Sequence, residues 1–347
     1  MIEAFQETVR RAAADGRALR IRGGGTKDFH GVALEGEILD TRGWSGVIEY
    51  DPPELVLTAR AGTPITEVER TLAERGQMFA AEAPRLCPES TLGGVVAAGF
   101  SGPRRASAGS VRDYVLGVRV IDAQGRDLSF GGQVMKNVAG YDLSRFITGS
   151  FGTLALITEV SVKVLPLPEA EATIAFDLDE TSAIDRVNRW AGQPLPITAT
   201  AHVEGRLHVR LSGARPAVSA ALEKLGGDVV DGGPAFWTTL RDQQHAFFTS
   251  APALWRLSIK PTTPPLALGP TLTEWNGGLR WIAADLDPEA AHAAARRAGG
   301  HATLYRGGRP ATGIQRLEPG VLALHQRLKS ALDPNCLFGP HRIHPDF

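Results

Sequence analysis

The sequence is poor in cysteine, and its charges nearly cancel. Only Cys87 and Cys336 occur among 347 residues, and the formal net charge is −1. Two isolated thiols cannot hold an iron–sulfur cluster or build a disulfide scaffold, and they suit a reducing compartment. A net charge near zero gives no overall field that would attract nucleic acid or an anionic membrane surface. We therefore expect no nucleic-acid partner.

Long apolar runs are also absent. No stretch reaches the length of a membrane-spanning helix, and the N-terminus lacks the basic start and apolar core of a secretion signal. We expect a cytoplasmic protein without direct membrane insertion, peripheral on the inner face of the plasma membrane only through a partner. The hydrophobic content of 43% and the charged content of 22% are ordinary for a globular protein. The length allows two domains or one large one.

A glycine-rich turn after the first predicted strand is the stretch around which the chain is organised. Glycine has no Cβ and tolerates positive φ, so consecutive backbone N–H groups can curl round an anion. Flanking positive charges and a hydroxyl would complete a pyrophosphate site. The candidate residues are Arg22, Gly23, Gly24, Gly25, Thr26 and Lys27. An ordinary glycine-rich turn explains the pattern equally well, and the glycine spacing does not fit the Rossmann fingerprint.

A second motif covers residues 89–103. Ser90 or Thr91 can cap a helix of small residues over 92–98, on which a flat ligand or another backbone can pack closely. Further backbone donors follow at Gly102, Gly109 and Ser110, and Asp113 precedes a strand. The alternative is a tightly packed helix without a ligand.

A third motif runs from Lys136 to Leu143 and continues to Gly152 and Thr153, before an apolar strand. Glycines at the entry to a buried strand let a ligand contact main chain, or they make a tight turn. Lys136 would neutralise a phosphate or a reduced cofactor, or be solvated.

Hydrophobic periodicity predicts a mixed chain whose composition changes at 165–168. Predicted helices cover 2–15, 65–75, 92–98, 183–190, 217–225, 288–298 and 317–332. Predicted strands cover 18–22, 37–40, 46–50, 55–59, 114–121, 127–130, 154–164, 172–178, 199–203, 206–211, 255–259 and 279–284. Thr63 and Pro64 are expected to cap the second helix, and residues 124–125 to form a hairpin turn.

The second and third motifs resemble the PCMH-type FAD-binding fold of the vanillyl-alcohol-oxidase superfamily, in particular its glycolate oxidase and D-lactate dehydrogenase branch. The resemblance spans residues 18–165, with a weaker echo at 333–342. It implies an α+β protein with an FAD-binding domain over 1–168, made of subdomains over about 1–76 and 77–168. A small α+β cap domain over 169–312 and a C-terminal segment, 313–347, that returns to the FAD domain would follow.

The resemblance also implies which residues bind FAD. Residues 22–27 would hold the pyrophosphate, Asp113 would support the loop before it, and main chain near Ile157 would meet the adenine end or the ring edge. The pyrophosphate, ribityl and ring region would be lined by Ser90, Thr91, Gly93, Gly94, Gly102, Gly109 and Ser110. Relatives that tether the flavin place histidine beside the cradle glycines, where Thr26 stands here, so we expect non-covalent FAD. His30, four residues further on, is expected to be a loop residue.

The chain departs from catalytic members of the branch, which carry a histidine-rich metal-binding segment in the cap. The nearest candidate here is His202 to His208, where Gly205 indicates a hairpin turn. We expect no metal site, and no catalytic residue can be assigned. Gly99, Ser101 and Phe151 also replace the residues usual in catalytic relatives.

The chain keeps the FAD-binding motifs but lacks the substrate-binding residues usual in catalytic relatives. In this combination it resembles the small FAD-binding subunits of bacterial glycolate oxidases. That resemblance implies two partners, a larger catalytic flavin subunit and an iron–sulfur subunit. The complex would oxidise glycolate, a small 2-hydroxy acid, to glyoxylate. This chain would relay electrons or complete the assembly, with the main catalytic site on a partner.

Two alternatives stay open. A self-sufficient oxidoreductase would use cap residues suited to binding and deprotonating a carboxylate substrate; these are Arg241, His245, Trp255 and Lys260. A non-redox scaffold would dock through the apolar stretches 235–240 and 251–257, which a buried core explains equally well.

Overall fold

The computed structural model describes residues 1–32, 34–132, 143–307 and 313–346. Most of the third motif, including Lys136, lies outside the described residues. The chain divides into two compact units. The first unit comprises Met1–Ser101, Ser110–Leu167 and Arg316–Phe347, and the second comprises Gly102–Gly109 and Pro168–Gln315.

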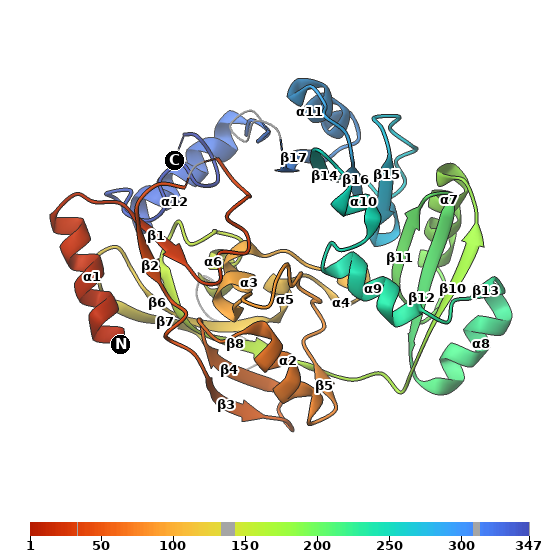
Figure 1. Cartoon of the computed structure of the whole chain (residues 1–347), viewed down its shortest axis with the longest axis horizontal. Coiled ribbons are helices and arrows are strands. Elements are labelled where there is room, and N and C mark those ends of the chain that lie inside the picture. The colour runs from red at the N-terminus through yellow and green to blue at the C-terminus, as the bar shows by residue number, and fades with distance from the viewer. Residues whose placement is uncertain (33, 133–142, 308–312, 347) are drawn as a thin grey trace. The chain divides into compact units, whose positions relative to one another are not determined.

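The first unit combines helices with three sheets (Figure 1). Its helices are α1 (Ile2–Ala14), α2 (Ile65–Ala73), α3 (Leu92–Ala98), α5 (Val111–Tyr114), α6 (Leu143–Ile147) and α12 (Pro319–Leu332). Its strands are β1 (Leu19–Arg22), β2 (Glu37–Asp40), β3 (Val47–Asp51), β4 (Val56–Arg60), β5 (Gln77–Met78), β6 (Val115–Ile121), β7 (Asp127–Gly131), β8 (Leu156–Lys163) and β9 (Leu165–Pro166). The sheets are β1-β2, β5-β9 and the antiparallel β3-β4-β8-β6-β7.

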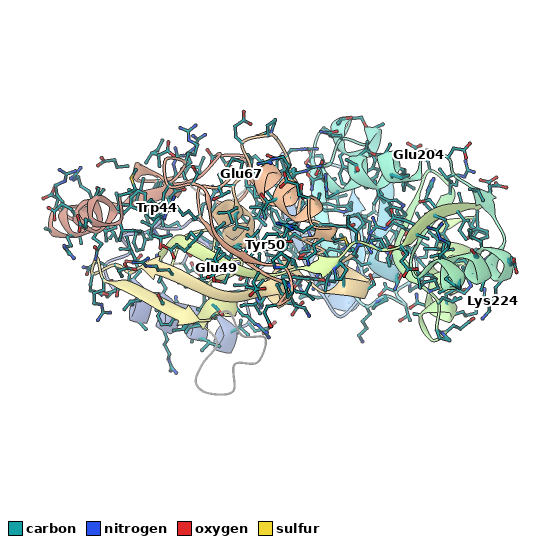
Figure 2. All side chains as sticks on the ribbon, turned by 90° about the horizontal axis from the view of Figure 1, so that it is seen from below. Trp44, Glu49, Tyr50, Glu67, Glu204 and Lys224 are labelled. Carbon is teal, nitrogen blue, oxygen red and sulfur yellow. The ribbon has the colours of Figure 1, made fainter. Side chains whose placement is uncertain are left out.

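Local chemistry explains the hairpin between β6 and β7. Asp122 accepts hydrogen bonds from the backbone N–H groups of Gln124 and Arg126, both at 2.9 Å. Gly125 then takes a φ of +73°, which favours glycine. The predicted turn at residues 124–125 is confirmed. A link between two of the sheets comes from Tyr50 of β3, labelled in Figure 2, whose hydroxyl bonds Gln77 of β5 at 2.7 Å.

The C-terminal segment belongs to the first unit. Leu19 of β1 pairs with Phe338 in a parallel bridge, and both side chains are buried. Phe5, Val9 and Ala12 of α1, spaced by four and three residues, pack into the same cluster. Strand β1, which leads into the glycine turn, is therefore held in place by helix α1 and by the C-terminal segment around Phe338.

The second unit is built on one eight-stranded sheet with the order β13-β10-β12-β11-β15-β16-β14-β17. Its strands are β10 (Ala170–Asp177), β11 (Ile197–Val203), β12 (Arg206–Gly213), β13 (Asp228–Val229), β14 (Leu254–Ser258), β15 (Thr271–Glu274), β16 (Leu279–Ile282) and β17 (His301–Arg306). Its α-helices are α4 (Arg105–Ala108), α7 (Glu180–Ala191), α8 (Arg215–Leu225), α9 (Gly233–Arg241), α10 (Ala246–Thr249) and α11 (Pro288–Arg297). These elements confirm the predicted α+β class.

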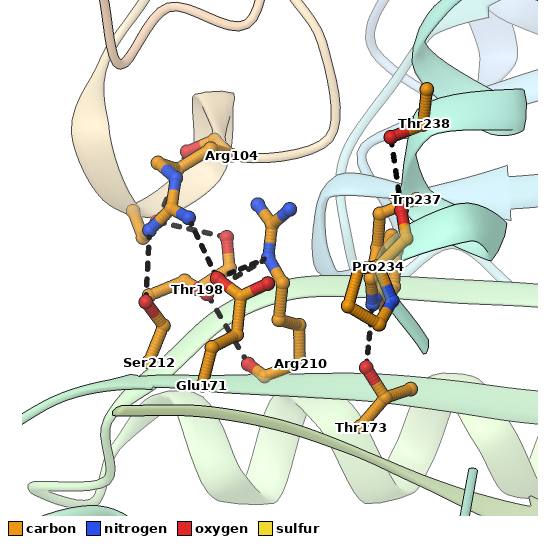
Figure 3. Close-up of polar contacts among 10 residues, drawn as sticks. Arg104, Glu171, Thr173, Thr198, Arg210, Ser212, Pro234, Trp237 and Thr238 are labelled. Carbon is orange, nitrogen blue, oxygen red and sulfur yellow. Dashed lines mark hydrogen bonds and ion pairs between the residues drawn. The ribbon is translucent and has the colours of Figure 1, made fainter. Parts of the chain in front are cut away.

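Residues 102–109 join this sheet although they lie far from its strands in sequence. Arg104 donates to Ser212 at 3.4 Å and to the carboxylate of Glu171 at 3.2 Å (Figure 3). Ser107 adds a hydrogen bond of 2.9 Å to the carbonyl of Thr198. Because the Arg104 side chain is buried and ion-paired, this short segment is held firmly in the second unit.

Three local predictions need correction. Helix α2 begins at Ile65, as predicted, but its N-cap is Pro64 and not Thr63, because the Thr63 hydroxyl instead donates to the Arg60 carbonyl at 2.7 Å. Strands β15 and β17 were not predicted. The proposed docking surface is largely hydrophobic core, because its two stretches, 235–240 and 251–257, supply buried residues of α9 and β14. These include Trp237, Trp255 and Leu257, and only part of each stretch is accessible to a partner.

Candidate cofactor-binding site

The glycine turn after β1 lines an open cavity of about 690 Å³ in the first unit. The other walls come from α3, from the loop before β8 and from the C-terminal segment. The lining includes Arg20, Ile21, Arg22, Gly23, Gly24, Gly25, Thr26, Lys27, Asp28, Thr91, Gly94, Ala97, Phe151, Gly152, Gly339 and Arg342.

A second cavity of about 370 Å³ adjoins the first. Both cavities are lined by Ile21, Gly23, Gly94, Ala97, Phe151 and Gly152. The second cavity extends the lining to Gly93, Ala155 and Ile157. Together the two make an elongated space with small residues on one wall, which suits a long, partly flat ligand.

The three glycines of the turn are required by close packing within the protein. A Cβ on Gly23 would lie 2.4 Å from the Thr91 hydroxyl, and one on Gly24 would lie 1.8 Å from the Glu89 carbonyl oxygen. Gly25 has a φ of +67°. These positions let the turn approach the segment before α3, and they leave its backbone facing the cavity.

Positive charge surrounds the turn. Among the described residues, the first cavity is lined by Arg20, Arg22, Lys27 and Arg342 and by two carboxylates, Asp28 and Glu35. Arg22 is paired with Asp28 at 2.9 Å. The Nε atom of Arg20 is buried and has no hydrogen-bond partner among the described residues. The excess of positive over negative charge along the cavity favours an anionic ligand.

Lys27 is the most informative of these groups. Its side chain is only 8% exposed, and within the described parts of the chain it has no ion pair, only a hydrogen bond of 3.3 Å to the Thr26 hydroxyl. Burial lowers the pKa of Lys27 to about 8. An ammonium group held in this way gains from a bound anion, because the anion supplies the missing counter-charge.

Arg342 reaches the same cavity from the far end of the chain. It donates to the Lys27 carbonyl at 2.8 Å, and its guanidinium lies 5.8 Å from the ring centre of Phe151. Phe151 itself has a φ of +53°, a rare conformation for a bulky residue that often marks functional sites. Arg20, Phe151 and Arg342 were not among the predicted binding residues. Only the basic Arg20, two residues before the turn, carried a signal in the sequence.

The structure brings most of the predicted binding residues together, but not all. Residues 22–27, Thr91, Gly93, Gly94 and Ile157 line the two cavities, and the Ser90 hydroxyl donates to Thr26 at 3.3 Å. Ser110 and Asp113 form a capping box on α5, in which the Asp113 carboxylate accepts from the Ser110 N–H at 2.7 Å. Gly102 and Gly109 belong to the second unit. None of these last four lines either cavity.

The α3 helix begins as expected. Thr91 is its N-cap, with the hydroxyl accepting from the Gly94 N–H at 3.2 Å, and Gly99 ends the helix in the left-handed conformation. Gly94 faces the cavities, and a Cβ there would meet only the Thr91 hydroxyl, at 3.1 Å. This wall can therefore accept a ligand surface in close contact.

The candidate metal-binding pair lies on a hairpin. Val203 pairs with Arg206 across the turn, so His202 pairs with Leu207 and His208 with Ala201. Directly paired residues share a face, which puts the two histidines on opposite faces of the sheet. They cannot bind one ion together. Among the described residues, no group of three or more His, Cys, Asp and Glu side chains could hold a metal.

Three of the four cap residues named for a self-sufficient oxidoreductase are engaged in local structure. Arg241 is paired with Asp242 at 2.8 Å, the His245 ring accepts from the Phe247 N–H, and Trp255 is buried in the core. A cavity of about 890 Å³ in the second unit is lined by other residues, among them Glu204, Phe247 and Thr271. Each of Arg241, His245 and Trp255 has a local structural role.

No helix in the described ranges has the length and apolar character that crossing a bilayer requires. The two cysteines, Cys87 and Cys336, are free thiols.

Comparisons with known proteins agree with the geometry. A family model described as an FAD binding domain matches residues 2–131. The chain is 43% identical to the glycolate oxidase subunit GlcE of Escherichia coli (strain K12) over 345 residues, covering 99% of this chain and 97% of the relative. It is 35% identical to the glycolate oxidase subunit GlcD of Bacillus subtilis (strain 168), but over only 44% of this chain and 33% of that relative.

A D-lactate dehydrogenase of Archaeoglobus fulgidus is 33% identical over 42% of this chain and 33% of its own length. Among solved structures, alkyldihydroxyacetonephosphate synthase aligns with a TM-score of 0.64 at 16% identity, covering 97% of this chain and 75% of that one. That likeness concerns the fold alone. The near-complete match to GlcE and the FAD-binding domain establish that the chain is an FAD-dependent oxidoreductase subunit of the glycolate oxidase subunit GlcE family.

Proposed function

We propose that this chain is a subunit of a complex that oxidises glycolate to glyoxylate, and that it holds FAD non-covalently at the glycine turn. The observation that carries the proposal is the 43% identity to GlcE along 99% of the chain. It is supported by a cationic, glycine-lined cavity whose glycine turn lies within the matched FAD-binding domain.

The residues present fit FAD on physical grounds. A pyrophosphate would supply the counter-charge that buried Lys27 lacks among the described residues, and it would accept hydrogen bonds from Arg20 and from the backbone of the turn. Arg22 and Arg342 would add positive charge. When bound, FAD supplies the redox chemistry of the subunit, and the protein supplies position and electrostatics.

Non-covalent binding is supported by the side chains along the turn. Thr26, which cannot form the histidyl link that tethered relatives use, occupies the position beside the cradle glycines. His30 stacks on Phe151 at 5.2 Å and contacts Phe100 edge-on at 5.2 Å, which gives the imidazole a packing role.

The proposed partners are a larger catalytic flavin subunit and an iron–sulfur subunit. Support for the first comes from the name of the partial relative GlcD, itself a glycolate oxidase subunit. Support for the second comes from Cys87 and Cys336, which are too few for a cluster on this chain. The main catalytic site would lie on a partner, and this chain would relay electrons or complete the assembly. We also propose that the chain is cytoplasmic and that its complex holds it at the inner face of the plasma membrane.

Flavin analysis of the purified subunit tests the proposal. The full chain, isolated alone and from its complex, is expected to show a flavin absorption spectrum. Acid precipitation should leave the FAD in the supernatant, because no covalent bond retains it. A subunit without flavin in both preparations contradicts the proposed cofactor role, and flavin that stays in the pellet contradicts non-covalent binding.

A further inference from the structure

The phenyl ring of Phe151 lies where the two cavities of the first unit adjoin. Six described residues line both cavities, and of these only Ile21 and Phe151 carry a side chain larger than a methyl group. The φ of Phe151, +53°, is one that a bulky residue rarely adopts. A side chain that lines a cavity from a strained backbone indicates a role in the site.

Hydrogen bonds to helix α3 enforce this backbone conformation. The Phe151 N–H donates to the Ala97 carbonyl at 2.8 Å, and the Gly149 N–H donates to the Val96 carbonyl at 3.0 Å. Both carbonyls belong to the last turn of α3, where helix carbonyls lack partners within the helix. The loop is thus fastened to the helix whose small residues form a wall of the site, so Phe151 keeps its position relative to that wall.

Side chains from three segments of the chain meet at the ring. The His30 imidazole lies 5.2 Å from it, with the two ring planes inclined by 28°, and Phe100 meets it edge-on at 5.7 Å. From the C-terminal segment, the guanidinium carbon of Arg342 lies 5.8 Å from the ring centre. An arginine at this distance is attracted by the negative face of an aromatic ring.

Arg342 is also fastened to the loop that follows the glycine turn. Its side chain donates to the Lys27 carbonyl at 2.8 Å, and its own carbonyl accepts from the Val32 N–H at 2.9 Å. The residue is only 8% exposed. A desolvated guanidinium gains more from an aromatic ring than an exposed one does. The hydrogen bond and the ring together hold the guanidinium on the wall of the larger cavity.

We propose that Phe151 is a positioning residue for Arg342, and that its ring holds the guanidinium ready for an anion in the larger cavity before that anion binds. Ordering the arginine in advance lowers the entropic cost of binding, because a long side chain otherwise loses freedom when a ligand fixes it. The anion is taken to be the diphosphate of FAD, an identification that rests on the proposed function. The effect of Phe151 on FAD affinity then passes through Arg342.

A double-mutant cycle on FAD affinity tests the proposal, with dissociation constants from equilibrium dialysis of the full chain. Phe151→Leu should weaken FAD binding roughly fivefold, the scale of a partly buried cation–π contact. Arg342→Met should weaken it about tenfold, and the double variant should stay near that value, because an absent guanidinium cannot be positioned. Independent effects would instead multiply to about fiftyfold.

Further variants separate the ring contact from general packing. Phe151→Tyr keeps the ring and should recover most of the wild-type affinity. Phe151→Met fills a similar volume without a ring, and it should resemble Phe151→Leu. Phe146→Leu, the same substitution at an exposed phenylalanine of α6, should bind FAD like the wild type. Circular dichroism of each apoprotein shows whether the variant is folded.

The outcomes distinguish this inference from the proposed function. A Phe151→Leu variant with wild-type affinity overturns the role given to Phe151, and so does a double variant whose loss is the product of the two single losses. Equal losses for Phe151→Leu and Phe151→Tyr overturn it as well, because the ring would then not be the cause. A wild-type chain that binds no FAD overturns the proposed function together with this inference, whereas any of the other results on a chain that binds FAD contradicts only the positioning role.

Discussion

The ammonium group of Lys329 donates a hydrogen bond of 2.7 Å to the carboxylate of Asp333, one helical turn further along the chain. Both groups are almost completely buried. Lys329 also donates to the Thr153 carbonyl at 2.7 Å and to the Phe338 carbonyl at 2.9 Å. Asp333 accepts from the N–H groups of Leu337 and Phe338, both at 2.8 Å. This pair therefore joins the end of α12 to the loop before β8.

The Lys329–Asp333 pair lies directly behind the proposed FAD site. Thr153 follows Gly152, which lines both cavities, and Phe338 bridges Leu19 of the strand that enters the glycine turn. Gly339 and Arg342, which line the larger cavity, come immediately afterwards. We infer that the pair positions one wall of the site.

Lys329→Met should lower the free energy of unfolding by about 3 kcal/mol, because it leaves the buried Asp333 carboxylate without its counter-charge. It should also lower FAD retention. Denaturant unfolding and flavin absorbance measure the two effects. Lys224→Met is the matched control, since Lys224 is an exposed lysine of α8, labelled in Figure 2. Indistinguishable unfolding curves for the two variants would refute the role given to the pair.

Gly94→Leu should abolish FAD retention while the chain stays folded. The new side chain would extend into the space shared by the two cavities, and its Cβ would meet only the Thr91 hydroxyl. Gly320→Leu in α12, where nothing lies within 4 Å of the added Cβ, is the control. The flavin-to-protein ratio measures the result. Full flavin content in Gly94→Leu would exclude these cavities as the FAD site.

Gly24 is a poorer probe than the sequence indicates. From the sequence, Gly24→Val would be expected to place a Cβ against the phosphates. In the structure that Cβ would clash with the Glu89 carbonyl oxygen, so the variant would disturb the turn whether or not FAD binds there. Loss of flavin from Gly24→Val would therefore not locate the pyrophosphate.

FAD affinity should depend on pH through Lys27. A bound phosphate raises the pKa of Lys27 above its value of about 8 in the free protein. Affinity should therefore be constant below about pH 8 and fall above it, approaching about tenfold per pH unit, since binding then requires proton uptake. Fluorescence titration with FAD from pH 6 to pH 9.5 measures this. Lys27→Arg should bind without the decline, and a wild-type affinity that is constant over the whole range would contradict the assignment.

Arg342→Met should weaken FAD binding about tenfold, the effect of removing one charge-assisted contact to a phosphate. Equilibrium dialysis against FAD gives the dissociation constant. Arg327→Met, which changes an exposed arginine of α12, serves as the comparison. If the two variants retain the same affinity as the wild type, Arg342 is a wall of the cavity without a role in binding.

Short-range signals in the sequence predicted much of the fold. Ser90 or Thr91 as a helix cap predicted the start of α3, and residues 124–125 predicted the β6–β7 hairpin, because both signals act within a few positions of the chain. The predicted hairpin at Gly205 is likewise present between β11 and β12. Strands β15 and β17 were not predicted, because their own residues carry no clear strand pattern. They are extended because they pair with the neighbouring strands β16 and β14 of the sheet.

The long-range parts of the site could not be predicted. Arg342 reaches the Lys27 carbonyl across 315 positions of sequence, and no local pattern indicates that approach. Residues 102–109 interrupt the first unit and join the second through Arg104 and Trp275, so Gly102 and Gly109 belong to another unit than the glycines with which they were grouped. The glycine turn itself was recognisable, since its function depends on backbone freedom within a few residues.

The measurement that tests the central claim most directly is the flavin stoichiometry of the purified full-length chain after incubation with FAD and removal of free ligand. We expect close to one FAD per wild-type chain, released completely by acid, and almost none on Gly94→Leu. Wild-type protein that is folded but retains no flavin, or a Gly94→Leu variant that retains as much as the wild type, would contradict the account.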